Sequence, residues 1–304
     1  MYTSDTMNNP ARKTAPTETP PDAKTTLPPA PIPHSPTVSA MQNLYDRYFA
    51  SHDYQKRYPG PNLATMAFLM RHGVGSAASI IDIGCGDGRY AVALLDASQA
   101  QLTGCDISSQ ALKEFSSRLA GRPDAHRVNL VHGPVESVPA NELFDVALLL
   151  FGVLSHAGER PARVAMLRGI RQRTAPGGCL LATVPNLWRR RPWELLCSVY
   201  GLLRGTVSTF GDIQFTRVID GAPRQFFYHL YSIAGLRQEL DDAGWQLEST
   251  SAESLLPEWL ITQHPRMALI DGWIRPLLPA SWGYGIRVCA RPMARSITES
   301  FQTK

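Results

Sequence analysis

Three glycines at alternate positions, Gly84, Gly86 and Gly88, have the spacing in this 304-residue chain that most directly indicates chemistry. The almost wholly apolar stretch 79–83 precedes them, as a buried parallel strand would, and apolar positions three and four apart follow from Arg89. A strand, a glycine turn and a helix let the backbone approach a ligand closely and direct helix N–H groups at it. The pattern therefore predicts a loop of the nucleotide-binding kind.

The spacing excludes two common nucleotide loops. A dinucleotide loop needs Gly-x-Gly-x-x-Gly, but here the third glycine comes one residue early and Arg89 stands where the pattern requires glycine. The Gly-Lys-Ser/Thr ending of a phosphate-binding loop is also missing. An acid, Asp106, closes a second apolar stretch and lies 24 positions after Asp82. A carboxylate in that place is suited to accept hydrogen bonds from both hydroxyls of a ribose.

The stretch 80–90 resembles motif I of the class I S-adenosylmethionine-dependent methyltransferases, whose first strand ends Asp/Glu-x-Gly-x-Gly-x-Gly. Further resemblances follow in the family's order at 131–136, 144–151 and 175–181. The resemblance implies a Rossmann-like fold, S-adenosylmethionine as the cofactor and methyl transfer as the activity. It also implies a cofactor site formed by Asp82, Gly84, Cys85, Gly86, Gly88, Asp106, Ile107, Pro134, Val135 and Phe151.

One part of the implied site departs from the family pattern. After the third strand the family commonly carries Gly-Asp-Ala, with the acid or its neighbours holding the adenine amino group, whereas this chain has Gly133-Pro134-Val135. No side-chain acceptor is present at Pro134. The adenine would then be held by the backbone around Val135 or by Glu136.

Two histidines are candidates for a catalytic base: His156, just after the expected fourth strand, and His229, within 225–232. The ordinary pKa of histidine suits proton removal near neutral pH, although each side chain has an equally open structural interpretation. Methyl transfer requires a base only when the acceptor must lose a proton, as an alcohol does and a carboxylate does not. The reaction needs no metal, and the sequence contains no spacing typical of a metal site.

The elements that would position these residues alternate regularly between 78 and 187. Such alternation predicts an α/β fold, a doubly wound and mostly parallel sheet with right-handed crossovers. Ligands of these folds bind at the carboxyl ends of the strands, so Gly84, Asp106, Pro134 and Phe151 would share one rim. Strands are expected near 79–83, 101–105, 128–132, 143–150, 179–184, 246–252 and 286–291, the last antiparallel in the family. Helices are expected near 88–98, 108–120, 159–174 and 233–243.

Segments of different composition surround the cofactor-binding core at 78–187. Residues 1–38 hold nine of the 24 prolines and are expected to be a disordered tail. Residues 39–77 are rich in tyrosine and are expected to form two short helices around 58–61. This segment either packs on the sheet edge or covers the sulfonium of the cofactor as a lid, in which case Arg57 would lie near the carboxylate of the cofactor. Residues 188–231 are expected to form an insertion or substrate lid, with a solvated basic turn at 189–191. The apolar helix that begins at Pro192 would either pack on the core or serve as a lid or membrane-surface contact, with Trp193 lining the acceptor site. Residues 232–293 would complete the sheet around a second apolar insertion at 254–284, and 294–304 are a short tail.

Composition limits the compartment and the partners. The net charge of +4 is mild, the five cysteines lack disulfide spacing, and no stretch is apolar enough to be a transmembrane segment. We expect a cytoplasmic protein without a DNA partner. The apolar insertions favour a small or lipid-like acceptor, with peripheral membrane contact left open. Arginines 189–191 and Tyr228-His229 leave a tRNA wobble-uridine-type acceptor as an alternative, and a cofactor-binding protein without turnover as another.

Overall fold

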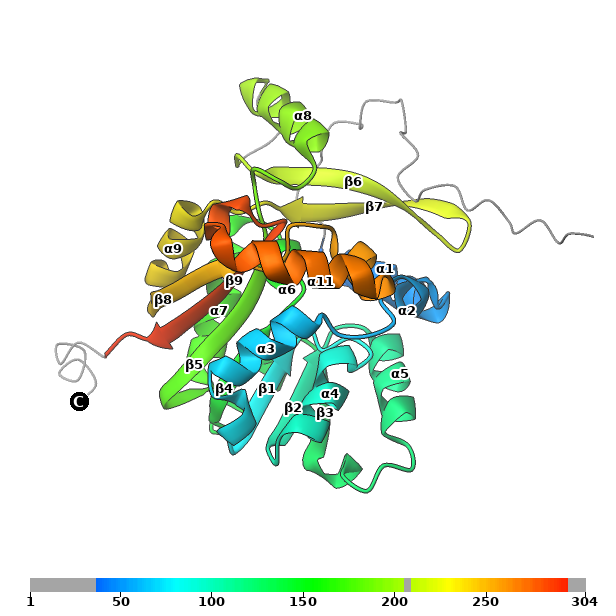
Figure 1. Cartoon of the computed structure of the whole chain (residues 1–304), viewed down its shortest axis with the longest axis vertical. Coiled ribbons are helices and arrows are strands. Elements are labelled where there is room, and N and C mark those ends of the chain that lie inside the picture. Colours follow the sequence, from blue (N-terminus) through cyan, green and yellow to red (C-terminus); the bar gives the residue numbers. More distant parts are fainter. Residues whose placement is uncertain (1–36, 205–208, 295–304) are drawn as a thin grey trace, which may run out of the picture. The chain divides into compact units, whose positions relative to one another are not determined.

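A seven-stranded sheet with the strand order β3-β2-β1-β4-β5-β9-β8 organises the fold (Figure 1). The computed structural model describes residues 37–204 and 209–294, all within the unit 31–304, so the two predicted tails lie almost wholly outside the described residues. β9 is antiparallel to its neighbours β5 and β8, and the other strand pairs are parallel, as predicted. The strands are β1 (Ser79–Ile83), β2 (Gln101–Asp106), β3 (Val128–His132), β4 (Phe144–Leu149), β5 (Thr174–Pro185), β8 (Trp245–Ala252) and β9 (Gly285–Pro292).

Helices cover both faces of this sheet because its central strands are apolar on both sides. In β1, Ile80 packs with α3 (Leu63–Arg71) and α4 (Arg89–Ala97), whereas Ile81 packs with α7 (Arg160–Gln172) and α9 (Ile233–Asp242). The helix α5 (Ser109–Leu119) begins at Ser108, whose hydroxyl accepts a hydrogen bond from the Ala111 N–H and caps the helix. The doubly wound prediction is confirmed.

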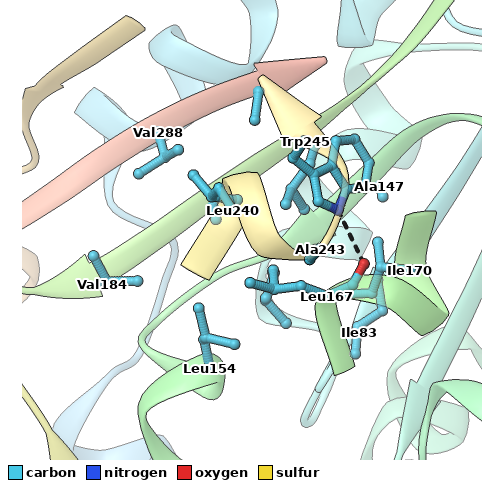
Figure 2. Close-up of a cluster of buried hydrophobic side chains, with 14 of the residues drawn as sticks. Ile83, Ala147, Leu154, Leu167, Ile170, Val184, Leu240, Ala243, Trp245 and Val288 are labelled. Carbon is cyan, nitrogen blue, oxygen red and sulfur yellow. Dashed lines mark hydrogen bonds between the residues drawn. The ribbon is translucent and has the colours of Figure 1, made fainter. Parts of the chain in front are cut away.

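The core on the α7 and α9 face is centred on Trp245, which is fully buried at the start of β8 (Figure 2). Its indole Nε1–H donates to the Leu167 carbonyl of α7 at 2.9 Å, so the ring is buried without losing a hydrogen bond. Leu154, from the one-turn helix α6 (Val153–His156), belongs to the same cluster. This packing fixes α6, and with it the end of β4, against the sheet.

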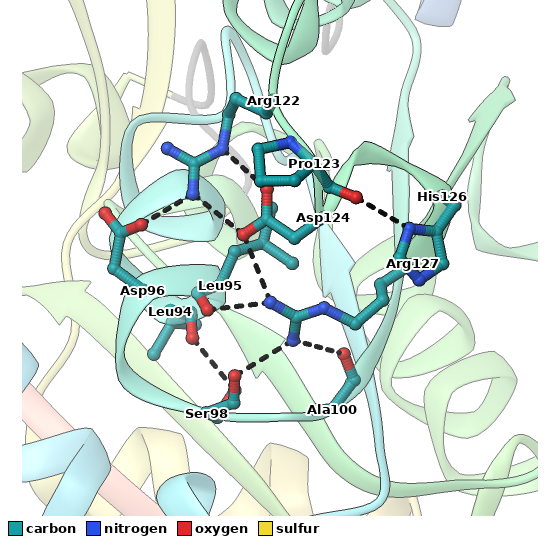
Figure 3. Close-up of polar contacts among 10 residues, drawn as sticks. All are labelled: Leu94, Leu95, Asp96, Ser98, Ala100, Arg122, Pro123, Asp124, His126 and Arg127. Carbon is teal, nitrogen blue, oxygen red and sulfur yellow. Dashed lines mark hydrogen bonds and ion pairs between the residues drawn. The ribbon is translucent and has the colours of Figure 1, made fainter.

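A polar network fixes the edge of the sheet near β3 (Figure 3). Arg127, at the end of the short 3-10 helix η2 (Ala125–Arg127), donates to the carbonyls of Leu95 and Ser98, where α4 ends. Asp124 bridges Arg127 and Arg122 at 3.1 and 2.8 Å. These contacts satisfy carbonyls that the end of α4 leaves without helical partners.

Three further groups of elements complete the fold. The N-terminal lid consists of α1 (Val38–Ala50), α2 (Asp53–Arg57) and α3, three helices where the sequence predicted two. A two-stranded hairpin, β6 (Asp212–Ile219) and β7 (Ala222–His229), was not predicted, and the Tyr231 N–H just after it donates to the Pro185 carbonyl at the end of β5. The remaining elements are α8 (Pro192–Leu203), η3 (Val135–Ser137), α10 (Glu258–Gln263), α11 (Pro265–Ile274), η1 (Val74–Ser76), η4 (Arg275–Leu277) and η5 (Ala280–Trp282). Within the described part of the chain, no helix is long and apolar enough to cross a membrane.

Candidate cofactor and acceptor site

Packing inside the fold already requires two of the three glycines after β1. Gly84 and Gly88 have φ of 69° and 76°, values that residues with a Cβ rarely adopt. A Cβ at Gly84 would lie 2.5 Å from Val153 of α6, and one at Gly88 would lie 2.2 Å from the Phe115 ring of α5. These two positions are glycine because neighbouring helices occupy the space.

Gly86 and Asp106 form the part of the loop that a ligand can approach. The nearest atom to a Cβ at Gly86 would be Phe49 Cζ of the lid, at 3.3 Å. The N–H groups of Gly86 and Ser108 donate to the two Asp106 carboxylate oxygens, both at 2.8 Å. Each oxygen keeps a further lone pair, which is what two ribose hydroxyls need. Burial raises the pKa of Asp106 to about 6 against the opposing effect of these hydrogen bonds, so the group is largely ionised at neutral pH.

Asp82, near the end of β1, is a buried acid that accepts no hydrogen bond from the described residues. Its side chain is 3% exposed. Burial, followed by the charge of Asp106, raises the pKa of Asp82 to about 7. A carboxyl group held close to its titration point beside the glycine loop can pair with a cationic ligand group.

The implied adenine region lies at the end of β3. Pro134 is exposed, and Val135 is buried in the core at the start of η3. The Glu136 carboxylate lies against α7, where a Cβ added at Gly169 would meet its Oε1 at 2.8 Å. Of the other residues implied in the cofactor site, Cys85 is buried and Ile107 is partly buried.

Phe151, at the end of β4, has a strained backbone. Its φ of 59° is unusual for a bulky residue, and its N–H donates to Thr183 Oγ1 of β5 at 2.6 Å. The ring makes an edge contact with Tyr58 of the lid, with centroids 4.7 Å apart, and lies 4.5 Å from the Arg89 guanidinium. Strain of this kind collects at functional sites, because surrounding contacts must hold it.

The aromatic residues of the lid pack onto the rim and the hairpin. Tyr48, Phe49, Tyr54 and Tyr58 are all buried. The lid is held down by Asp46, whose Oδ1 accepts hydrogen bonds from the Ser108 hydroxyl and the Gln110 N–H at 2.7 and 3.1 Å. These contacts show that the tyrosine-rich segment packs on the fold, and they place the Phe49 ring beside Gly86 of the glycine loop.

His156 lies within this aromatic cluster, and both ring nitrogens have partners. Its Nδ1 is 2.8 Å from the Phe227 carbonyl, which can only accept, so Nδ1 carries the proton. Nε2 then accepts from the Tyr45 hydroxyl of α1 at 2.9 Å. Burial, aided by the charges of Arg217 and Arg190, lowers the pKa of His156 to about 3. The histidine is therefore neutral and weakly basic.

His229 is held in a different environment. Its Nδ1 lies 2.6 Å from Asp212 Oδ1, and Asp212 lies 3.6 Å from Arg163, which pairs with Glu239 at 2.7 Å. Residues 226 and 228 of β7 point at His156, so side-chain alternation along the strand turns His229 to the other face. The structure does not bring the two predicted bases together.

Arg89 is a site residue that the sequence did not reveal. It begins α4 directly after the glycine loop, is 3% exposed, and pairs with Glu258 of α10 at 2.7 Å. It also donates to the Gly60 carbonyl of the lid at 3.2 Å. Nothing local in the sequence indicates these contacts, because Glu258 is 169 positions away.

The arginines at 189–191 do not form the solvated basic turn that the sequence suggested. Arg189 is exposed, but Arg190 lies 4.8 Å from the ring centre of Tyr284. Arg191 lies 3.8 Å from the ring centre of Phe215 and pairs with Glu194. The following helix, α8, was expected to pack on the core, yet most of its apolar side chains are exposed. Exposed fractions are 69% for Trp193, 59% for Leu196 and 81% for Leu203.

Comparison with known proteins agrees with this geometry. Residues 81–180 match the family model described as a methyltransferase domain. The cypemycin N-terminal methyltransferase of a Streptomyces species is 26% identical over 170 residues, which are 55% of this chain and 67% of the relative. The tRNA U34 carboxymethyltransferase of Pseudoalteromonas atlantica is 29% identical over 102 residues, 34% of this chain and 30% of the relative.

Among solved structures, an S-adenosylmethionine-dependent methyltransferase from Clostridium acetobutylicum shares the fold, with a TM-score of 0.56 and 10% identity. The match covers 83% of this chain and all of that one. The matched domain, the sheet order and the glycine loop define a Rossmann-like methyltransferase fold. These matches show a methyltransferase domain at residues 81–180, and they support S-adenosylmethionine-dependent methyl transfer as the activity of the chain.

Proposed function

We propose that the chain transfers the methyl group of S-adenosylmethionine to a small or lipid-like acceptor held among the lid, the hairpin and the rim of the sheet. The bound cofactor supplies a methyl group on a positively charged sulfur. The acceptor atom forms a bond to the carbon as the carbon–sulfur bond breaks, and the electron pair of that bond stays on sulfur. The residues of this chain have to align the acceptor and exclude water.

The cofactor residues have separate roles in this proposal. Asp106 accepts hydrogen bonds from the ribose hydroxyls, and Gly86 leaves room for the cofactor to approach the backbone. Asp82 faces the cationic amino group, whose charge would hold the carboxyl in its ionised form. Phe151 closes the rim beside the sulfonium, where an aromatic ring favours a cation. The loop and the adenine pocket are completed by Gly84, Cys85, Gly88, Ile107, Pro134 and Val135.

One observation carries the acceptor assignment: aromatic rings from three separate elements meet beyond the end of β4. His156 lies 4.6 Å from Tyr228 of the hairpin and 5.5 Å from Tyr45 of the lid, measured between ring centres. Tyr45 in turn lies 5.9 Å from Phe226. Rings gathered around a neutral histidine favour a planar or aliphatic acceptor, because they offer apolar surface with few polar groups.

The state of His156 favours an acceptor that does not need a strong base. A histidine with a pKa near 3 removes protons poorly, and its Nε2 lone pair already accepts from Tyr45. His156 therefore acts mainly by orienting the Tyr45 hydroxyl in this proposal. The buried contacts of His229 support a structural role for it.

A tRNA acceptor, the alternative, receives less support. Of the arginines at 189–191, only Arg189 is exposed, while Arg190 and Arg191 face aromatic rings. Contacts with phosphates require exposed cations on the protein, and their binding releases counterions from the nucleic acid. A role as a cofactor-binding protein without turnover differs from the main proposal only in the outcome of the assay described below. The cytoplasmic location also stays a proposal, in keeping with the cysteines, which are all unpaired among the described residues.

Peripheral contact with an anionic membrane surface forms part of the proposal for a lipid-like acceptor. Exposed apolar side chains gather on α8 and on the α11–η4 segment, including Trp193, Trp273 and Leu277. The exposed charges on or directly after these segments are basic, namely Arg204 and Arg266, whereas Asp271 is buried and Glu194 pairs with Arg191. Tryptophan and arginine beside aliphatic side chains are typical of surfaces that bind the membrane interface.

The function is tested by incubating the purified chain and metabolite, lipid and RNA fractions with cofactor labelled on the methyl group. We expect label in small or lipid-like products. Gly86→Arg should abolish the transfer, because its side chain fills the space left for the cofactor, and circular dichroism should confirm that the variant is folded. Label found only in RNA would replace the acceptor proposal with the tRNA alternative. Cofactor binding without label in any fraction would favour the protein without turnover.

A further inference from the structure

The charges of three arginines from different parts of the chain act on one buried tyrosine, Tyr58. Arg57 of α2 donates its Nε–H to this hydroxyl at 3.1 Å. Although burial opposes ionisation of Tyr58, the charges of Arg217, Arg57 and Arg190, in that order, outweigh it and lower the pKa of the phenol. A region that makes a buried phenol more acidic carries an excess of positive charge.

Arg190 is the clearest case of an unbalanced cation in this region. It follows the end of β5, is partly buried, and lies 5.1 and 4.8 Å from the ring centres of Tyr228 and Tyr284. Its backbone N–H donates to the Asn186 carbonyl at 3.2 Å, but its guanidinium makes no hydrogen bond and no ion pair with the described residues. The acid that faces it, Glu253, has a pKa raised to about 7 by burial and by the charge of Glu258, and its Oε1 atom has no hydrogen-bond partner in the described part of the chain.

Arg217 of β6 approaches the same region from the hairpin. Its guanidinium donates to the Tyr48 hydroxyl at 3.0 Å and lies 5.4 Å from the ring centre of Phe226. No carboxylate among the described residues pairs with it. Two partly buried guanidiniums, one after β5 and one from the hairpin, therefore contact aromatic rings and a phenol but form no ion pair with a described carboxylate.

Other buried arginines in this chain show that such an arrangement is not required by the fold. Arg89 pairs with Glu258, and Arg163 pairs with Glu239, both at 2.7 Å. Removing a guanidinium from water without a carboxylate partner is unfavourable, and contact with a ring face offsets only part of that cost. A bound anionic ligand would supply the negative charge that Arg190 and Arg217 lack.

We infer that Arg190 and Arg217 bind an anionic group of the methyl acceptor, a carboxylate attached to a planar or aliphatic apolar body. This inference rests on the proposed function, since it describes the same acceptor site. The rings of Tyr228, Phe226 and Tyr45 hold the apolar part, and the two guanidiniums hold the charge with the bidentate geometry that suits carboxylates. Arg57, on the lid, is left for the carboxylate of the cofactor.

The inference is tested by calorimetry on the full chain saturated with S-adenosylhomocysteine. The probes are benzoate and dodecanoate, each compared with its uncharged amide. We expect both carboxylates to bind more tightly than the amides, and Arg190→Met and Arg217→Met to weaken the carboxylates at least about tenfold while leaving the amides unchanged. Arg189→Met, an exposed neighbour, is the matched control and should change nothing.

Two further measurements separate this inference from its competitors. The thermal stability of the ligand-free Arg190→Met chain should be equal to or above that of the wild type, because an unbalanced buried charge is removed. A purely structural arginine would cause a loss of stability. If both arginine variants lose S-adenosylhomocysteine affinity instead, or if carboxylates and amides bind equally, the acceptor assignment is wrong. Failure of the wild type to bind S-adenosylhomocysteine would overturn the proposed function itself.

Discussion

Asp106 combines two properties that make cofactor affinity depend on pH. Its carboxylate accepts the Gly86 and Ser108 N–H groups, and burial raises its pKa to about 6. The ionised form accepts ribose hydroxyls, and protonation removes acceptor capacity. Affinity for S-adenosylhomocysteine is therefore expected to be level above pH 7 and to fall by up to about tenfold per pH unit below pH 6.

The matched variant for this prediction is Asp106→Asn, studied by calorimetry between pH 5 and 8. At pH 8 it should bind the cofactor product more weakly by about 1.5–3 kcal/mol, the scale of a hydrogen bond to a charged group. Its affinity for the cofactor product should also no longer fall below pH 6. If the Asn variant keeps the pH dependence of the wild type, the dependence must arise from another group, and Asp82, whose pKa is about 7, is then the candidate.

At the scale of elements, α1 is joined to the rim through the Tyr45–His156 hydrogen bond. Burial holds the pKa of His156 at about 3, below the value of about 6.5 that an unfolded histidine has. Between these two pH values the unfolded chain takes up a proton that the folded chain does not. The folded state therefore loses stability as pH falls below about 6.5, by at most about 1.4 kcal/mol per pH unit from this group.

Urea unfolding at pH 7.5 and 5.5 measures this effect. His156→Gln removes the titrating group and keeps a donor and an acceptor, so its stability should fall less than that of the wild type over the same interval. Equal losses in the two chains would mean that His156 is protonated in the folded state. That result would reopen its role as a general base.

The positions of the strands along the chain and their directions could be predicted from the sequence, since each strand lies between local signals. The apolar stretch 79–83 forms β1 with the expected bounds, and Gly84, Asp106 and Phe151 lie at the carboxyl ends of β1, β2 and β4, as expected. The hairpin β6–β7 could not be predicted, because its strands pair with each other outside the main sheet. The tight Arg89–Glu258 pair was also beyond reach, for it joins residues with no shared local pattern.

Side-chain environments were less predictable than positions. Both His156 and His229 were candidate catalytic bases in the sequence. In the structure His156 lies among aromatic rings, whereas His229 lies against Asp212. Strand alternation in β7 separates the two environments, and this alternation could be used only once the segment was known to be a strand. Trp193 was expected to line the acceptor site, but it lies on the outside of α8.

At the scale of the whole molecule, the exposed apolar side chains of α8 and α11 give a prediction about membranes. The chain should sediment with vesicles that contain about one third phosphatidylserine, and less with purely zwitterionic ones, because the exposed charges there are basic. Trp193→Ser and Trp273→Ser should weaken vesicle binding several-fold without lowering thermal stability, since both rings are mostly exposed.

Val218→Ser provides the control for this experiment. Val218 is exposed to a similar degree, 64%, but lies on β6 of the hairpin. It should leave vesicle binding unchanged. Loss of binding in all three variants would indicate a general hydrophobic effect, and retention in both tryptophan variants would exclude this surface as the membrane contact.

The Arg89–Glu258 pair also sets the earliest point during synthesis at which the glycine loop can be enclosed. Arg89 directly follows the glycine loop, but Glu258 is added 169 residues later. At about 5–20 residues per second, a ribosome needs roughly 8–35 s to cover that distance. Throughout this interval the guanidinium beside the loop lacks its carboxylate, so a nascent chain that already contains the loop cannot yet enclose it. We therefore expect the chain to hold the cofactor only after α10 has been synthesised.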